Sequence, residues 1–258
     1  MAAIAGGSRL VVAPQNLRGF RGLTLDGYGA LLEGGPGSMP RVLARLVADR
    51  GTVVDRSVHD AWRKALRTQY AAHPFIAFRE VHHKVFQEMF IRFGIRGEVD
   101  PHIDEAFDEY RSVRAYAEVS SVLRDLEADV AMAVISNMDT MVLLQALHQN
   151  RLAFTFVITS EEEQRYKPSA SIFQRAIRYL GLPAANILHV GDSYVEDVVG
   201  ARAVGMGTAL IERNGATGNP PRTSGRVIRD LREVKELIRK SRDESGRSGE
   251  TTRPPQGS

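Results

Sequence analysis

The chain has 258 residues, and its 43% hydrophobic content is enough for a sizeable core within one large domain or one domain that carries an insertion. The absence of Cys excludes disulfides and thiolate metal sites, and the net charge of +3 comes largely from arginines near both ends, which argues against a nucleic-acid partner. The first residues do not form a charged segment followed by an apolar one, and no run of about eighteen apolar residues occurs, so we expect a cytoplasmic protein without a membrane partner.

Residues 1–16 are predicted to be poorly ordered, and the first regular element is the apolar segment 22–26. This segment predicts a short strand that ends in Asp26, and a turn containing Gly27 and Gly29 follows at once. A carboxylate at a strand end beside a flexible turn can act as a nucleophile, although an Asp in this place can also simply cap the turn.

Residues 38–117 predict one helix after another and no strand. Gly51 and Gly94 are expected to end two of these helices, and Ser57 is expected to cap another. Each predicted helix carries an apolar stripe at the helical period. The stripes are Val42, Leu43, Leu46 and Val47; Val58, Ala61, Trp62, Ala65 and Leu66; Phe78, Val81, Val85, Phe86, Met89, Phe90 and Phe93; and Ile103, Phe107, Tyr110 and Val113.

From residue 118 onward, predicted helices alternate with short apolar strands. Such alternation predicts a parallel sheet with helices on both faces. The helices are expected at 119–127, 140–149, 170–180, 195–204 and 231–240, and the strands at 130–135, 156–158, 187–190, 208–211 and 227–228. Residues 241–258 contain no aliphatic or aromatic side chain and are predicted to be poorly ordered.

The strand at 22–26 is expected to join this sheet, which makes the helical stretch an insertion after the first strand. In parallel sheets of this kind, ligands bind outside the carboxyl ends of the strands, near the point where the strand order reverses. Asp26, Ser136 and Asp192 each fall at the end of a predicted strand. The sequence therefore predicts an α/β fold with a functional site at that edge of the sheet.

Four polar motifs follow one another along the chain. They are Asp26 with its glycine turn; Ser136-Asn137; Lys167-Pro168; and Gly191-Asp192-Ser193 with Asp197. This ordered set resembles the haloacid dehalogenase (HAD) superfamily of hydrolases over roughly residues 20–240. The resemblance implies a Rossmann-like parallel-sheet core formed by residues 17–36 and 118–240, with an all-helical cap domain inserted at residues 37–117.

The resemblance also implies catalytic roles. Asp26 is the expected nucleophile, which forms a covalent intermediate with the substrate. Lys167 and Ser136 are expected to hold the transferring group, Lys167 through its compact positive charge and Ser136 through its hydroxyl. Asn137 is expected to orient the substrate or the nucleophile.

A metal is expected beside the nucleophile. Two unit charges about 4 Å apart repel by on the order of 4 kcal/mol at an effective dielectric of 20, so an anionic substrate needs a cation near Asp26. Mg²⁺ held by Asp26, Asp192 and the backbone carbonyl of Tyr28 would supply it. Ser193 and Asp197 are expected to support this site, with Asp197 holding a metal-bound water or orienting Lys167; Glu196 is a rival for that role.

The first motif is closer to another branch of the superfamily. Asp26 to Leu32 resembles the pattern of L-2-haloacid dehalogenases, which attack carbon and need no metal. Tyr28 stands where most HAD phosphatases have a second Asp as general acid/base, and Ala30 replaces the usual Thr. The Tyr28 hydroxyl is the remaining candidate to protonate a leaving oxygen. Arg63, on a predicted helix of the cap, resembles the dehalogenase Arg that contacts the substrate.

The fourth motif favours the phosphatase branch. Asp192 is a carboxylate at the position where the dehalogenase pattern has a residue with a hydroxyl group. Our first hypothesis is a Mg²⁺-dependent phosphatase that acts on a small-molecule phosphate through an aspartyl-phosphate, as a monomer or homodimer. Two alternatives stay open: a metal-free L-2-haloacid dehalogenase, and a catalytically impaired HAD-fold binding protein in which Tyr28 marks the loss of activity.

Overall fold

The computed structural model describes residues 19–34, 38–49, 56–213 and 225–249. The predictions for residues 1–16, for Gly51 and for residues 250–258 lie outside these ranges. Within them, no helix combines the length and the apolar character needed to cross a bilayer.

The centre of the molecule is a six-stranded sheet in which every pair of neighbouring strands is parallel. The strands are β1 (Gly22–Leu25), β2 (Ala131–Ser136), β3 (Phe156–Thr159), β4 (Ile187–Gly191), β5 (Gly207–Ile211) and β6 (Arg226–Ile228). Their order is β3-β2-β1-β4-β5-β6, so the chain starts in the middle of the sheet and builds first to one side and then to the other. Leu25 pairs with Val134 on one side and with Val190 on the other, which brings the ends of β1, β2 and β4 together.

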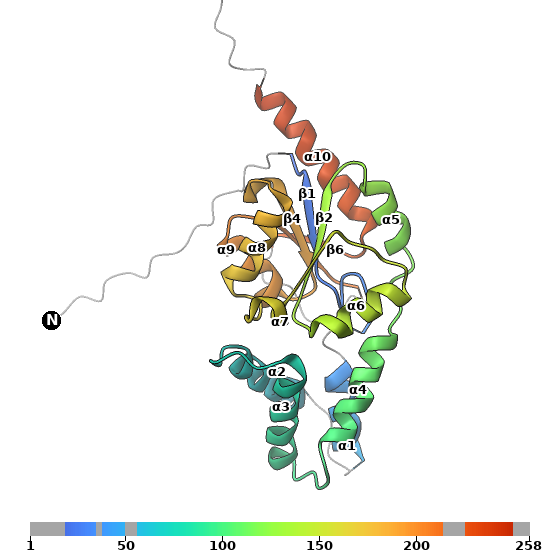
Figure 1. Cartoon of the computed structure of the whole chain (residues 1–258), viewed down its shortest axis with the longest axis vertical. Helices are drawn as coiled ribbons and strands as arrows, with labels where there is room; N and C mark the ends of the chain where they lie inside the picture. The colour runs from blue at the N-terminus through green and yellow to red at the C-terminus, as the bar shows by residue number, and fades with distance from the viewer. Residues whose placement is uncertain (1–18, 35–37, 50–55, 214–224, 250–258) are drawn as a thin grey trace, which may run out of the picture.

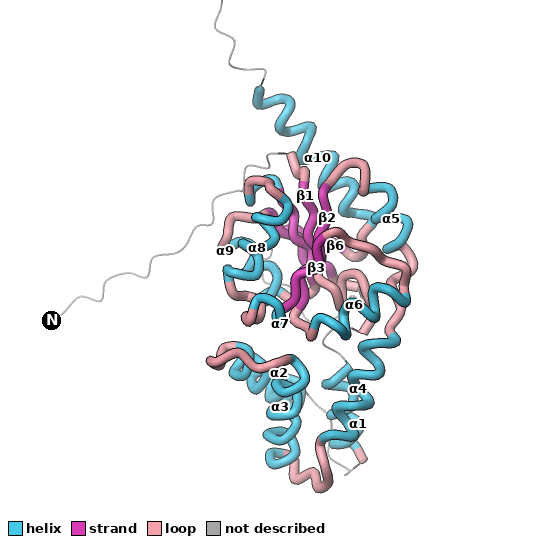
Figure 2. The backbone as a smooth tube through the Cα atoms, in the orientation of Figure 1, coloured by secondary structure: helices cyan, strands magenta, loops and turns pink. Residues whose placement is uncertain are grey.

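Helices cover both faces of this sheet (Figures 1 and 2). They are α5 (Val119–Leu126), α6 (Thr140–Gln149), α7 (Ser160–Glu163), α8 (Ala170–Leu180), α9 (Gly200–Ala203) and α10 (Arg232–Gly249), with a 3₁₀ turn, η2 (Ala184–Asn186), and a π-helical turn, η3 (Tyr194–Val199). The predicted Rossmann-like parallel fold is confirmed, and the bounds of α6 and α8 agree with the sequence prediction. The predicted helix 195–204 is instead divided between η3 and α9.

Four helices follow β1 and lie below the sheet in Figure 1; we call them the helical block. They are α1 (Ser38–Ala48), α2 (Arg56–Tyr70), α3 (Phe78–Arg92) and α4 (Asp100–Ser112). Aromatic side chains form the interior of the block: Trp62 packs edge-on against Phe86 with ring centroids 5.2 Å apart, and Phe78 packs against Tyr110 at 5.9 Å. These rings belong to the apolar stripes that the sequence predicts.

Two local predictions are wrong. Ser57 does not cap α2, because that helix already begins at Arg56 and Ser57 lies within its first turn. Residues 241–249 are not disordered but continue α10. Ser241 is fully buried, and its hydroxyl oxygen accepts a hydrogen bond from the Phe20 amide at 2.9 Å. Polar contacts therefore extend this helix where no apolar side chain is available to do so.

Candidate active site

A chain of buried charges lies at the carboxyl ends of the central strands. Asp26 follows β1, and its amide donates to the carbonyl of Val190 in β4 at 2.9 Å. The Lys167 ammonium lies 2.6 Å from an oxygen of Asp26 and 2.6 Å from an oxygen of Asp197. The Lys167 and Asp197 side chains are 3% and 1% exposed, so water screens this pairing very little. Lys167 thus bridges one acid that follows β1 and one that lies in the η3 turn.

A third carboxylate, that of Asp192, lies beside Asp26 and Asp197, and we call these three residues the acidic cluster. One oxygen each from Asp26, Asp192 and Asp197 lies within 4.8 Å of the others. Three carboxylates face a single lysine, so the cluster carries a formal charge of −2 when all of its groups are ionised. Hard oxygen donors in such a group are suited to a divalent cation, and these three residues could hold one.

The pKa values reflect this excess of negative charge. Burial, with a smaller contribution from the Asp197 charge, raises the pKa of Asp26 to about 7 even though Lys167 opposes the shift. Burial and the Asp26 charge likewise raise the pKa of Asp192 well above its usual range. Burial would also raise the pKa of Asp197, but Lys167 and His189 outweigh it and hold that pKa below its usual value. Asp197 is therefore the acid that stays ionised beside Lys167, whereas Asp26, which shares Lys167, and Asp192 hold a proton more readily.

Two glycines make this close approach possible. Gly29 has a φ of +95°, and a Cβ at this position would collide with the Asp192 carboxylate. A Cβ at Gly191 would collide with the Asp197 carboxylate in the same way. The turn after β1 and the end of β4 can therefore bring the acids together only with glycine at these two positions.

The two residues of the second motif, Ser136 and Asn137, lie in different environments. The Asn137 side chain accepts from the Lys167 amide at 2.7 Å and donates to the Lys167 carbonyl at 3.2 Å, so it holds the loop that carries the lysine. The Ser136 side chain is 2% exposed at the end of β2, and it touches the turn after β1, because a Cβ on Gly27 would lie 3.0 Å from its oxygen. Asn137 therefore fixes the backbone of Lys167, which contacts Asp26, and Ser136 is the hydroxyl beside the turn that carries Asp26.

The η3 turn positions the fourth motif. The Ser193 hydroxyl accepts from the Glu196 amide at 3.3 Å, and the Ser193 amide donates to Asp197 at 2.9 Å. His189, in β4, donates from Nε2 to Asp197 at 3.1 Å and accepts at Nδ1 from the Thr24 hydroxyl at 2.9 Å. The Ser193 amide, His189 and Lys167 thus fix the Asp197 carboxylate from three sides. Sequence reasoning missed His189, although a His in the otherwise apolar segment 187–190 was a visible signal.

Tyr28 does not occupy the position of a proton donor. Its hydroxyl donates to the carbonyl of Tyr110 in α4 at 3.1 Å, and the two rings pack edge to face with centroids 5.2 Å apart. Burial raises the pKa of this hydroxyl far above its usual range. The expectation that the Tyr28 side chain protonates a leaving oxygen is therefore corrected: its proton is engaged by the helical block.

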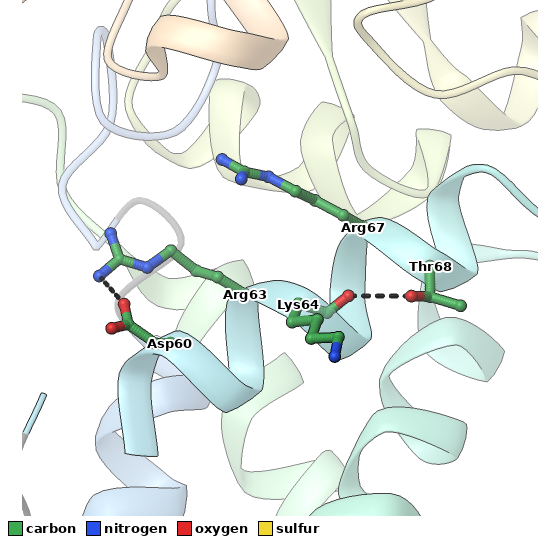
Figure 3. A pocket seen from close by; sticks show the side chains of 5 residues that line it. All are labelled: Asp60, Arg63, Lys64, Arg67 and Thr68. Carbon is green, nitrogen blue, oxygen red and sulfur yellow. Dashed lines mark hydrogen bonds and ion pairs between the residues drawn. The ribbon is translucent and has the colours of Figure 1, made fainter. Parts of the chain in front are cut away.

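Arg63 also differs from its expected setting. It lies on α2 and pairs with Asp60 of the same helix at 3.2 Å, with half of its side chain exposed (Figure 3). It does not pair with an acid of the cluster. Arg67, one helical turn further on, does reach the core: its Nε lies 3.6 Å from Glu196, the residue before Asp197.

Three further contacts, absent from the sequence analysis, hold the helical block against the strand ends. Asp139, two residues after Asn137, accepts from the Phe78 amide at 2.8 Å at the start of α3. The hydroxyl of Tyr166, the residue before Lys167, donates to the carbonyl of Ile76 at 2.8 Å. The Tyr166 ring also stacks on Tyr70 of α2 with centroids 4.2 Å apart. Residues next to the second and third motifs thus contact the helical block and its loops: Asp139 lies close to Asn137 in sequence, and Tyr166 precedes Lys167.

Comparison with known proteins gives this geometry a context. A family model described as haloacid dehalogenase-like hydrolase matches residues 58–211. Haloacid dehalogenase-like hydrolase domain-containing protein 3 of Xenopus laevis is 44% identical over 82 residues, which are 31% of this chain and 33% of that protein. The aligned part covers 25% of the relative's length in Danio rerio, 53% in Bos taurus and 70% in Mus musculus, so the chain spans only part of the first of these relatives.

Two further relatives have different activities in their names. The (S)-2-haloacid dehalogenase of Pseudomonas fluorescens is 24% identical over 236 residues, which are 88% of this chain and 100% of that enzyme. The glyceraldehyde 3-phosphate phosphatase of Methanothermobacter thermautotrophicus is 29% identical over 138 residues, which are 50% of this chain and 61% of that enzyme.

Solved structures share the fold. The L-2-haloacid dehalogenase RSc1362 superposes with a TM-score of 0.68 at 22% identity, covering 86% of this chain and 99% of that one. The HAD-hydrolase YfnB from Bacillus subtilis, bound to magnesium, superposes with a TM-score of 0.66 at 16% identity, covering 86% and 100%. With the family match over more than half of its length, the chain belongs to the haloacid dehalogenase-like hydrolase family.

Proposed function

We propose that this protein is a Mg²⁺-dependent phosphatase that acts on a small-molecule phosphate ester, with Asp26 as the nucleophile. The observation that carries the proposal is the acidic cluster, in which one oxygen of each of three carboxylates lies within 4.8 Å of the others while a single lysine pairs with two of the three. Buried charges without partners are costly, so such a cluster is stable in ionised form only with a further cation.

The residues present fit a divalent cation. Asp26 and Asp192 offer carboxylate oxygens, which Mg²⁺ prefers, and Lys167 already satisfies Asp197. The backbone carbonyl of Tyr28 stays in the proposal as a third ligand, because a side-chain change at position 28 does not remove it. When bound, Mg²⁺ would offset the negative charge of a phosphate ester beside Asp26.

Each side chain of the site has its own role in the proposed reaction. The ionised carboxylate of Asp26 attacks phosphorus, the bond to the leaving oxygen breaks, and the phosphoryl group is carried by Asp26 until water hydrolyses it. Lys167 neutralises charge on Asp26, and Asn137 holds Lys167 in place. The Ser136 hydroxyl is placed beside Gly27 to donate to a phosphoryl oxygen. Because the Tyr28 hydroxyl is engaged elsewhere, esters with good leaving groups are expected to react faster than sugar phosphates.

A second candidate, a metal-free 2-haloacid dehalogenase, is favoured by two (S)-2-haloacid dehalogenases that match along their whole length. The acidic cluster opposes it. A 2-haloacid is itself an anion, and a metal-free site could accept it without repulsion only if Asp192, next to the nucleophile, stayed protonated, which leaves this carboxylate no role. A third candidate, a binding protein of low activity, is favoured by the engagement of the Tyr28 hydroxyl.

An aryl phosphate assay separates the three. We expect hydrolysis of p-nitrophenyl phosphate that requires Mg²⁺ and stops with a chelator. Asp26→Asn should lower the rate by more than about 100-fold. The matched control is Asp125→Asn on α5, an exposed carboxylate that pairs with Lys235, and it should keep the wild-type rate.

Acid-quenched protein should carry phosphate on the peptide that contains Asp26, as seen by mass spectrometry. Halide release from L-2-chloropropionate without metal would instead support the dehalogenase. Mg²⁺ binding without turnover of any phosphate would support the binding protein.

A further inference from the structure

One face of α2 carries an excess of positive charge. Asp60, Arg63, Lys64, Arg67 and Thr68 line a hollow of about 570 Å³, and their spacing of three and four residues places them on one side of the helix. Three of these five side chains are cationic and one is anionic. Asp60 is the one acidic residue of α2, and it is already paired with Arg63.

This face lies toward the core rather than away from it. Figure 3 shows the guanidinium groups of Arg63 and Arg67 pointing to the same side of α2. Arg67 reaches Glu196 on η3 at 3.6 Å, and the next residue in the chain is Asp197 of the acidic cluster. One turn beyond Arg67, Tyr70 stacks on Tyr166, the residue before Lys167. Arg67 therefore connects the hollow to the turn that carries Asp197.

The charges in the hollow are available to a ligand. The side chains of Arg63 and Arg67 are 52% and 54% exposed, and the ion pairs that they make, at 3.2 and 3.6 Å, are long. The Arg63–Asp60 pair is exposed on both sides and contributes little to stability, so an anion with better geometry can replace Asp60 as the partner of Arg63. The Glu196 side chain is 18% exposed, and Arg67 keeps part of its side chain exposed for a second partner. Guanidinium groups bind carboxylates and phosphates through two parallel hydrogen bonds.

We infer that the hollow on α2 is a subsite for a second anionic group of the substrate, so that the preferred substrates are phosphate esters that also carry a carboxylate or a second phosphate. The inference rests on the proposed phosphatase function. In this arrangement the phosphoryl group that is transferred lies at Asp26, and Arg63, Lys64 and Arg67 bind the other anion. The helical block then selects the substrate by charge, although no residue of the block takes part in the chemistry.

Matched substrates test the inference without any variant. 3-Phosphoglycerate and glycerol 3-phosphate have the same three-carbon chain, but only the first has a carboxylate. Fructose 1,6-bisphosphate and fructose 6-phosphate make the same comparison for a second phosphate. We expect the second anion to raise kcat/KM by about tenfold or more in at least one pair, mainly through KM. The pair that responds identifies the anion.

A charge-removing variant tests the assignment to α2. The double variant Arg63→Gln and Lys64→Gln should lower that kcat/KM ratio by about tenfold or more, since it removes two of the three cations. Arg63→Lys, which keeps the charge and loses the planar fork, should give a smaller fall. The control is Arg124→Gln on α5, which removes one exposed positive charge outside the helical block and should leave the ratio unchanged. Thermal melting of each variant shows that the protein is folded.

The two levels of the proposal fail in different ways. If p-nitrophenyl phosphate is hydrolysed with Mg²⁺ but the wild-type protein shows no preference in either pair, the subsite is wrong and the phosphatase function stands. The same holds if the double variant keeps the wild-type ratio. If no phosphate is hydrolysed, the proposed function is wrong and the subsite falls with it.

Discussion

Replacing Tyr28 by Phe separates the two roles that this residue can have. The substitution removes only the hydroxyl, which donates to the carbonyl of Tyr110 at 3.1 Å. The ring stays in place against the Tyr110 ring, and the backbone of the turn after β1 does not change. The variant therefore tests whether the hydroxyl serves catalysis or holds the helical block to the core.

The structure sets the size of the expected effect. Tyr110 lies in the last turn of α4, where carbonyl groups have no partner within the helix, so the Tyr28 hydroxyl satisfies a buried acceptor. Loss of a buried hydrogen bond of this kind costs about 1–2 kcal/mol. For a chain of this length that is a fall in Tm of about 2–8 °C. If the hydroxyl were the general acid, kcat would instead fall by about 10²–10⁴-fold.

Calorimetry and steady-state kinetics on p-nitrophenyl phosphate and on a sugar phosphate measure both quantities. We expect a lower Tm, while kcat stays within about twofold of the wild-type value for both substrates. A sugar phosphate is the sharper probe, since its poor leaving group depends most on proton donation. If the turnover rate on that substrate fell by about 100-fold or more while Tm stayed unchanged, the result would falsify our assignment of the hydroxyl to the contact with α4.

Three further results are expected. Asp192→Asn removes a carboxylate from the acidic cluster, so the thermal stabilisation by Mg²⁺ seen with wild-type protein should disappear; a Tm that still rises with Mg²⁺ contradicts the ligand assignment. The pKa of Asp26 is raised to about 7, so below that pH a proton competes with the metal, and calorimetric titration should show Mg²⁺ affinity that rises by up to about tenfold from about pH 6 to about pH 8; a pH-independent affinity contradicts this. Burial lowers the pKa of His82 to about 4 from its usual 6.5, so the unfolded chain binds the extra proton and stability is lost as the pH falls from about 6.5 to about 4. Urea unfolding should show about 3 kcal/mol more loss over this interval in wild type than in His82→Leu, and equal losses would show that His82 is not the group responsible.

Much of the fold followed from local patterns. The alternation of helices and short apolar strands after residue 118 predicted the parallel sheet, because a parallel strand pair needs a crossover and a helix is the usual one. The apolar stripe from Phe78 to Phe90 predicted α3, because the spacing of its apolar residues matches the number of residues in a helical turn. Polar patterns were less informative. Residues 241–249 continue α10, and the Ser241 hydroxyl at the start of this stretch meets the amide of Phe20, which is 221 positions away along the chain.

In the acidic cluster, too, the sequence predicted some features, and only the folded structure decided others. The sequence alone determined that Asp26, Ser136 and Asp192 stand at strand ends and that Tyr28 replaces a carboxylate, because these are statements about order and residue type. Only the tertiary structure decided that Lys167 lies between Asp26 and Asp197, and that the Tyr28 hydroxyl is held by α4. Hydrogen bonds and charge pairing act over a few ångströms in space, and the partners here are between 30 and 141 residues apart in sequence. No local pattern encodes such a distance, so the partner of each polar group is known only once the chain is folded.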